Sequence, residues 1–124
     1  MKSRREHRVP LSPTAIELLS GLYREDGNSH LFIGERTRAG LGNMARPDVL
    51  QQMKQSDVTV HGFRSTFRDW AAESTAYPNH VVEQALAHTI SNAVEAAYRR
   101  GDLFEKRRHL MNDWAAFCER PRIA

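Results

Sequence analysis

The sequence holds one cysteine among its 124 residues and no long apolar run. Because Cys118 is alone, the chain forms no internal disulfide and offers no CxxC pair to a metal, which suits a reducing cytoplasm. No segment stays apolar over the roughly 20 residues that a helix needs to cross a bilayer, and no signal peptide opens the chain. We therefore expect a soluble, cytoplasmic protein with no membrane partner.

Sequence motifs for metals and nucleotides are also missing. The histidines do not form an HExxH pattern, and neither GxxxxGK[ST] nor GxGxxG occurs. The glycine- and arginine-rich stretch at residues 35–47 therefore predicts a flexible surface connection, able to touch a nucleic-acid backbone, rather than a phosphate-binding loop. We expect neither a metal nor a cofactor.

The overall charge is small. The 18 basic and 15 acidic residues leave a net charge of +3, which is weak evidence for a nucleic-acid partner. The distribution of the basic residues says more, because they gather at the start of the chain and beside Tyr98. We interpret residues 106–108 as a solvated helix face. The other two clusters contain the predicted nucleic-acid contacts, which are Arg4, Arg5, Arg99 and Arg100.

Apolar residues recur at helical spacing through most of the chain, and the 40% hydrophobic content fits one soluble domain with a modest core. Ser12 is the expected N-cap of the first helix, with Pro13 at its first position. Val9 to Leu11 predict one arm of a short β-hairpin, and residues 30–34 predict a short buried strand or extended stretch. We predict a mainly α fold with helices at residues 13–24, 47–55, 61–75, 78–88, 93–100 and from 102 onward.

The apolar stripe of each helix defines the expected core. The aromatic residues at 63, 67 and 70 have an alternative role as a base-stacking platform, but their spacing favours a buried helix face. The predicted core residues are Ile16, Leu18, Leu19, Leu22, Val49, Leu50, Met53, Phe63, Phe67, Trp70, Val81, Val82, Ala85, Leu86, Leu103, Leu110, Met111, Trp114 and Phe117.

The segment from residue 60 to residue 100 carries the residues with chemical potential. Arg64 follows His61 by three positions, so on a helix both side chains share a face and can converge on a small anion such as phosphate. Tyr98 lies ten residues after His88, where a further helix can carry its phenol toward the same anion. We interpret the remaining histidines and tyrosines as structural or merely exposed: His7, His30, His80, His109, Tyr23 and Tyr77.

These residues also carry a resemblance. HGFRSTFRDWAAES, VVEQALAH and NAVEAAYRRGDLFEKRRHLMNDWAAFC resemble the tyrosine recombinase family, above all phage and genomic-island integrases of the satellite-phage type. The H-x-x-R pair, the L-x-H element and the following tyrosine match that family's motifs in order and spacing. Any one motif is a weak signal, but the ordered set is specific.

The resemblance implies a chemistry and a set of partners. Tyr98 would attack a DNA phosphodiester and form a 3′-phosphotyrosyl link, while Arg64, His61 and His88 hold the phosphate or take the phenol proton. Lys2 matches a hairpin lysine that donates a proton to the leaving oxygen, with a solvated terminal lysine as its alternative. The partners would be double-stranded DNA and other integrase protomers. The last helix is then either core or the surface that meets a neighbouring protomer.

The resemblance also predicts what the chain leaves out. The family's active site begins with another arginine, on a helix upstream of a β-hairpin, and no residue before Lys2 matches it. We therefore expect residues 1–124 to be a single domain, the C-terminal part of a recombinase catalytic domain with a short β-hairpin remnant. The arm-binding, core-binding and first catalytic-arginine segments would be absent. This piece alone should fold without cleaving DNA.

Two other functions fit some of the same residues. A non-catalytic helical DNA-binding or assembly module would use Arg64 and its neighbours only to grip phosphate, and it would not need the hydroxyl of Tyr98. A metal-dependent nuclease is a weaker alternative that sensitivity to a chelator would reveal. The sequence does not decide which histidine acts as a base.

Overall fold

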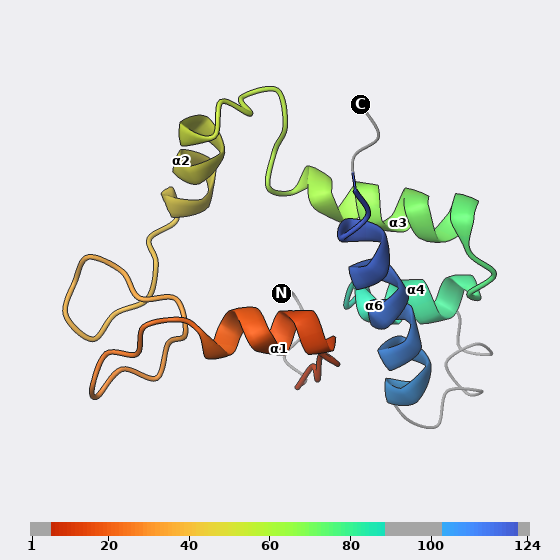
Figure 1. Cartoon of the computed structure of the whole chain (residues 1–124), viewed down its shortest axis with the longest axis horizontal. Coiled ribbons are helices and arrows are strands. Elements are labelled where there is room, and N and C mark those ends of the chain that lie inside the picture. The colour runs from red at the N-terminus through yellow and green to blue at the C-terminus, as the bar shows by residue number, and fades with distance from the viewer. Residues whose placement is uncertain (1–5, 89–102, 122–124) are drawn as a thin grey trace.

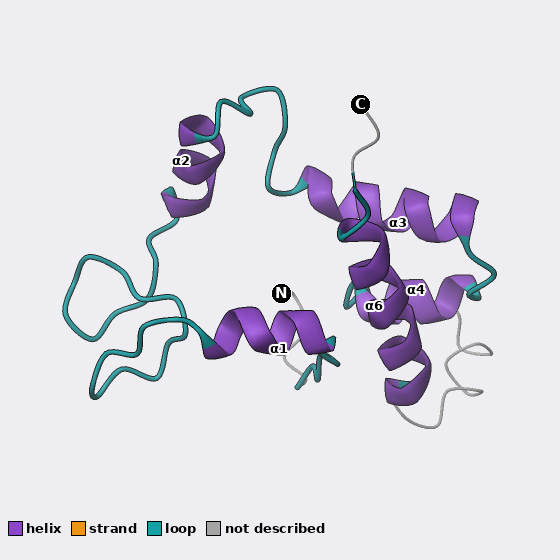
Figure 2. Ribbon diagram, viewed as in Figure 1, coloured by secondary structure: helices purple, strands orange, loops and turns teal. Residues whose placement is uncertain are grey.

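The computed structural model describes residues 6–88 and 103–121, and this part of the chain is mainly helical (Figures 1 and 2). The mainly α prediction is confirmed. An isolated antiparallel bridge joins Ile33 and Gly40, and the described residues form no strand. Residues 9–11 are irregular, so the predicted hairpin is not seen there, and its other expected residues, 1–5, lie outside the described part. The helices are α1 (Pro13–Ser20), α2 (Ala45–Gln52), α3 (Gly62–Ser74), α4 (Asn79–Ala85) and α6 (Phe104–Cys118).

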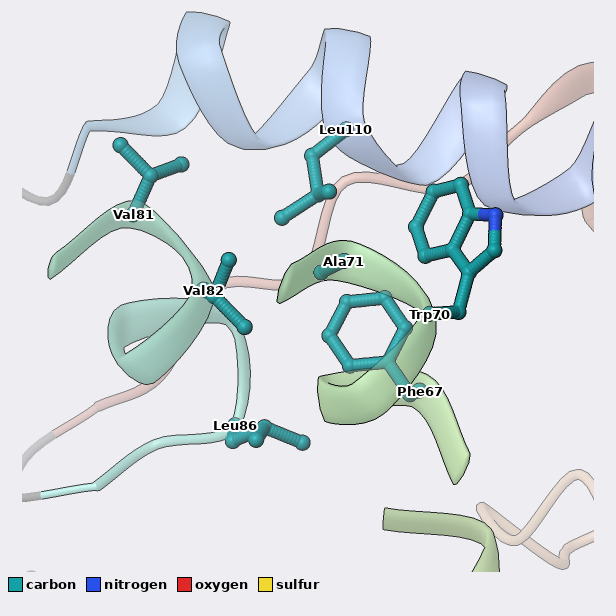
Figure 3. Packing of buried hydrophobic residues seen from close by; sticks show 7 residues of the cluster. All are labelled: Phe67, Trp70, Ala71, Val81, Val82, Leu86 and Leu110. Carbon is teal, nitrogen blue, oxygen red and sulfur yellow. The ribbon is translucent and has the colours of Figure 1, made fainter. Parts of the chain in front are cut away.

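The core lies where α3, α4 and α6 meet. Val81 on α4 and Leu110 on α6 have no exposed surface, and both belong to the buried cluster drawn in Figure 3. Phe67 and Trp70 of α3 complete this core, as their spacing predicts, whereas Phe63 is wrong as a core residue because its side chain is 54% exposed. The buried apolar residues are Phe67, Trp70, Ala71, Val81, Val82, Leu86 and Leu110.

Aromatic rings join α3 to α6. The ring of Trp114 lies edge-on to that of Phe67, with centroids 5.2 Å apart, and 5.1 Å from that of Trp70. Such pairs stabilise packing beyond the area they bury. The apolar stripe of the last helix is therefore mainly core, and only its end, at Phe117, remains substantially exposed.

One basic residue of the run at 106–108 is not solvated. Arg107 has no exposed surface, and its Nη1 donates a hydrogen bond of 2.5 Å to the carbonyl oxygen of Arg8. The guanidinium carbon also lies 5.6 Å from the centre of the Phe104 ring. Lys106 and Arg108 are exposed as expected, but the interpretation of the run as a solvated face is wrong for Arg107.

Helix α1 begins as predicted but buries nothing. Ser12 accepts a hydrogen bond from the backbone N–H of Ala15 at 3.2 Å, and Pro13 opens the helix. The prediction of its apolar stripe as core is wrong, since no α1 residue is buried and Leu18 is 70% exposed. Helical spacing predicts which face can be buried, but it does not supply a partner for that face.

Helix α2 and the loop before it show the same pattern. No α2 residue is buried, and Figure 1 shows α2 standing apart from the group of α3, α4 and α6. The predicted buried stretch at residues 30–34 is also wrong, because Leu31 and Phe32 are exposed. The side-chain amide of Asn28 stabilises this loop by donating a hydrogen bond to the carbonyl of Ala39 at 3.0 Å.

No described helix combines the length and apolarity needed to cross a membrane.

The contrast between Leu110 and Leu18 gives a stability prediction. We expect Leu110→Ala to lower the free energy of unfolding by about 2–5 kcal/mol, because it opens a cavity between α4 and α6. Leu18→Ala on α1 should change it by less than about 0.5 kcal/mol, since that side chain is mostly exposed. Urea unfolding followed by circular dichroism measures both. Equal losses for the two variants would show that the α1 face is as buried as the core.

Candidate active site

Arg64 reaches from α3 to the C-terminal end of α4. Its Nη2 donates a hydrogen bond of 2.5 Å to the carbonyl oxygen of Leu86, the C-cap residue of α4. Carbonyl groups at a helix C-terminus lack partners within the helix and carry partial negative charge, so they bind a guanidinium well. This bond holds Arg64 at a residue that lies two positions before His88 in the sequence.

His88 is placed by the turn that ends α4. Ala87 has a φ of 59°, in the left-handed region, and its N–H bonds to the carbonyl of Gln84 at 3.1 Å. The N–H of His88 bonds to the carbonyl of Glu83 at 2.9 Å. These two bonds form a Schellman motif, which satisfies the last carbonyls of the helix and fixes the direction of the next residue.

Glu83 contacts His88 a second time, through its side chain. Its Oε2 lies 2.5 Å from Nδ1 of His88, and its Oε1 forms an ion pair with Arg68 of α3. The Glu83 side chain is only 14% exposed, against 41% for His88 and 46% for Arg68. Sequence reasoning missed Glu83. The sequence feature that could have indicated Glu83 is its position five residues before His88, because a Schellman turn brings residues with that separation together.

The charge on His88 is set by these neighbours. Burial lowers the pKa of the His88 imidazole from its ordinary value, and the charges of Arg64 and then Arg68 lower it further. The Glu83 carboxylate acts in the opposite direction, but it also pairs with Arg68. Because the pKa is lower in the folded state than in the unfolded state, neutral His88 stabilises the fold above the unfolded pKa. That contribution is lost as the pH falls through the folded pKa.

His61 stands apart from this pair in the described contacts. It is the N-cap of α3 and is exposed, while the hydroxyl of Thr59 accepts the hydrogen bond from the N–H of Gly62 at 3.0 Å. No contact among the described residues joins its side chain to Arg64 or His88, so their convergence stays a prediction. Six other predicted site residues lie outside the described part: Lys2, Arg4, Arg5, Tyr98, Arg99 and Arg100.

Tyr77 has the environment of a structural tyrosine. Its hydroxyl donates a hydrogen bond of 2.5 Å to Oδ2 of Asp113. Burial, then this bond and the Asp113 charge, raise the pKa of Tyr77 to about 12. A phenol with a raised pKa ionises less readily than a free one, so Tyr77 is poorly suited to act as a nucleophile. It lines a surface pocket with Trp70 and Phe117, and Arg64 and His88 are not part of that pocket.

The sequence was compared with those of known proteins. It is 33% identical to prophage integrase IntA of Escherichia coli K12 over 93% of this chain. It is 31% identical to the integrase of enterobacteria phage P4 and 32% identical to the integrase of Shigella phage Sf6, each over 96% of this chain. The chain is related by descent to phage and prophage integrases.

The likeness to integrases covers only part of those proteins. The chain spans 28% of the length of the IntA and P4 integrases and 32% of the Sf6 integrase. No protein-family model matches the chain, and no solved structure does. Among the described residues, no group of three His, Cys, Asp or Glu side chains is arranged to hold a metal ion.

The left-handed residue in this integrase homologue gives the next prediction. At Ala87, the left-handed backbone conformation strains a residue with a Cβ by roughly 1–2 kcal/mol, and glycine removes that strain. Glycine also makes the unfolded chain more flexible, which offsets about 0.4–1 kcal/mol of the gain in stability. We therefore expect Ala87→Gly to raise the free energy of unfolding by about 0.5–1 kcal/mol. Ala72→Gly, at an exposed helical position of α3, should instead lower it by a similar amount. Thermal unfolding of both variants measures the difference, and a loss for Ala87→Gly would contradict the turn described above.

Proposed function

We propose that the protein carrying this chain is a tyrosine-type site-specific recombinase. It would cut and rejoin DNA through a 3′-phosphotyrosyl intermediate, with Tyr98 as the nucleophile. The observation that carries this proposal is that Arg64 binds the end of α4 two residues before His88, in a chain related to integrases. A guanidinium from α3 thus lies near enough to the imidazole that follows α4 for its charge to lower the pKa of His88.

Arg64 suits the binding of a scissile phosphate. Displacement at a phosphodiester adds negative charge to oxygens that already repel a nucleophile, so cationic donors must stand there in advance. A guanidinium has five N–H groups and keeps its charge at any working pH. One of these N–H groups donates to the carbonyl of Leu86, which restrains the orientation of the guanidinium. The other N–H groups can donate hydrogen bonds to phosphate oxygens.

The reaction can be written as two balanced exchanges. The phenol of Tyr98 loses its proton to a base, its oxygen bonds to phosphorus, and the bond to the 5′ oxygen breaks. That oxygen takes a proton, in our proposal from Lys2, and leaves as a 5′ hydroxyl. A 5′ hydroxyl of a second strand then reverses the steps. Because the phosphotyrosyl bond conserves the energy of the phosphodiester, joining needs no ATP.

Two partners belong to the proposal. Arg4, Arg5, Arg99 and Arg100 would bind phosphates of double-stranded DNA on either side of the cut. Other protomers would meet the chain at its last helix. Since Leu110 of α6 is buried in the core, the apolar surface that this helix can offer to such a contact lies at its exposed end around Phe117.

Replacing the proposed nucleophile tests the reaction directly. We expect Tyr98→Phe in the recombinase to leave DNA affinity nearly unchanged, because a charge-driven interface loses little with one hydroxyl. Covalent attachment to a nicked suicide substrate should disappear. Tyr77→Phe is the matched control and should keep the adduct. A denaturant-resistant adduct with the Tyr98 variant would rule out Tyr98 as nucleophile, whereas normal binding with no adduct in the wild type would favour a DNA-binding module.

Arg64→Lys separates a phosphate clamp from an ordinary phosphate contact. Lysine keeps the positive charge but lacks the planar guanidinium that can bind two phosphate oxygens at once. We therefore expect the rate of strand cleavage to fall by about two orders of magnitude, which corresponds to an activation barrier higher by roughly 3 kcal/mol. DNA affinity should change little. Arg108→Lys, at an arginine paired with Glu105 on the surface of α6, should alter neither quantity. Cleavage rates and filter binding at one salt concentration give the comparison, and equal losses in both would make Arg64 only an anchor.

A further inference from the structure

Glu83 is a carboxylate that contacts two basic groups near the end of α4. Its two oxygens face different partners, with Oε2 at Nδ1 of His88 and Oε1 at the guanidinium of Arg68. Its side chain is the least exposed of the three. A mostly buried carboxylate between two basic groups is held more firmly than either of them.

The backbone reinforces this arrangement. The carbonyl of Glu83 accepts the N–H of His88, so the same residue binds both the main chain and the ring of the histidine. A histidine held at two points has little freedom to turn its ring. The position of the imidazole therefore depends on Glu83 more than on any other described residue.

The contact also determines which ring nitrogen carries the proton. An ionised carboxylate only accepts hydrogen bonds, so Nδ1 of His88 must be the N–H group. In the neutral ring Nε2 is then the unprotonated nitrogen, and it points away from Glu83. The described residues give Nε2 no hydrogen bond. The ring thus presents a basic nitrogen on the edge opposite Glu83.

We propose that Glu83 is a positioning residue of the recombinase site, which holds His88 by Nδ1 so that Nε2 faces the scissile phosphate and the attacking phenol. This inference rests on the proposed function. It also assigns the two histidines different roles, since His88 is oriented as a proton acceptor by a carboxylate while the ring of His61 has no such partner among the described residues. Glu83 itself touches no reacting atom.

The arrangement predicts opposite effects for the two partners of the carboxylate. The groups that act on the charge of His88 are Glu83 on α4 and Arg64 and Arg68 on α3. Glu83→Gln removes the negative charge and leaves both arginines, so the pKa of His88 should fall. Arg68→Gln removes a positive charge and leaves the whole carboxylate to the histidine, so the pKa should rise.

Nitrogen-15 NMR of the imidazole side chains in the 124-residue chain tests this without any DNA. We expect the neutral His88 ring of the wild type to carry its proton on Nδ1, and the Glu83→Gln ring to populate both tautomers. The Arg68→Gln variant gives a second reading if Glu83→Gln fails to fold. Glu105→Gln, which removes a carboxylate paired with Arg108 on α6, should leave the His88 titration unchanged. An unaltered tautomer and pKa in both site variants would overturn the proposal.

The second arm measures covalent adduct formation by the recombinase across pH. Glu83→Gln should form the adduct about 10- to 100-fold more slowly, which is a part of the 10²- to 10⁴-fold that a positioned acid or base contributes. The pH at which the rate is half-maximal should shift in the same direction as the His88 pKa, which a purely structural ion pair would not cause. Altered NMR with an unaltered rate would remove Glu83 from the reaction. If the wild type forms no adduct, the proposed function fails, while the NMR arm still decides how His88 is held.

Discussion

The end of helix α4 is the point on which both the core and the candidate site depend. Leu86 buries its side chain in the apolar core, and its carbonyl accepts a hydrogen bond from the guanidinium of Arg64. The helix has only seven residues, far fewer than a helix needs to persist alone in water. It is held by Val81 and Val82, which are buried in the shared core (Figure 3). The positions of Arg64 and His88 therefore depend on the packing of α3, α4 and α6.

Sequence periodicity predicted the part of the fold in which helices have partners. Phe67, Trp70, Val81 and Val82 were correctly placed in the core, because each apolar stripe meets another stripe. The same reasoning failed for α1, whose Leu18 is spaced like a core residue but meets no covering element among the described residues. Periodicity describes one element at a time, and burial is a property of at least two.

Charge patterns misled in a similar way. A run of three basic residues is usually a solvated face, yet Arg107 is fully buried because a backbone carbonyl and the ring of Phe104 receive its guanidinium. Glu83 was overlooked because its importance depends on a backbone conformation. Ala87 must adopt a left-handed φ before the carboxylate can reach His88, and alanine gives no warning of that conformation. Motif spacing singles out Arg64 and His88 as candidates, but it gives no sign of Glu83, whose side chain contacts His88.

The charged groups at the end of α4 include more positive than negative charge. Arg64 and Arg68 bring two positive charges, Glu83 offsets one, and a charged His88 would leave the group more positive still. The two arginines therefore favour the neutral form of the histidine while no phosphate is bound, which agrees with its lowered pKa. A phosphate placed against Arg64 would reverse the balance, since its negative charge favours the imidazolium. By linkage, binding of a phosphate and uptake of a proton by His88 must then favour each other to the same degree. A histidine whose basicity rises when a phosphate binds suits the proposed reaction, in which a phenol must lose its proton beside that phosphate.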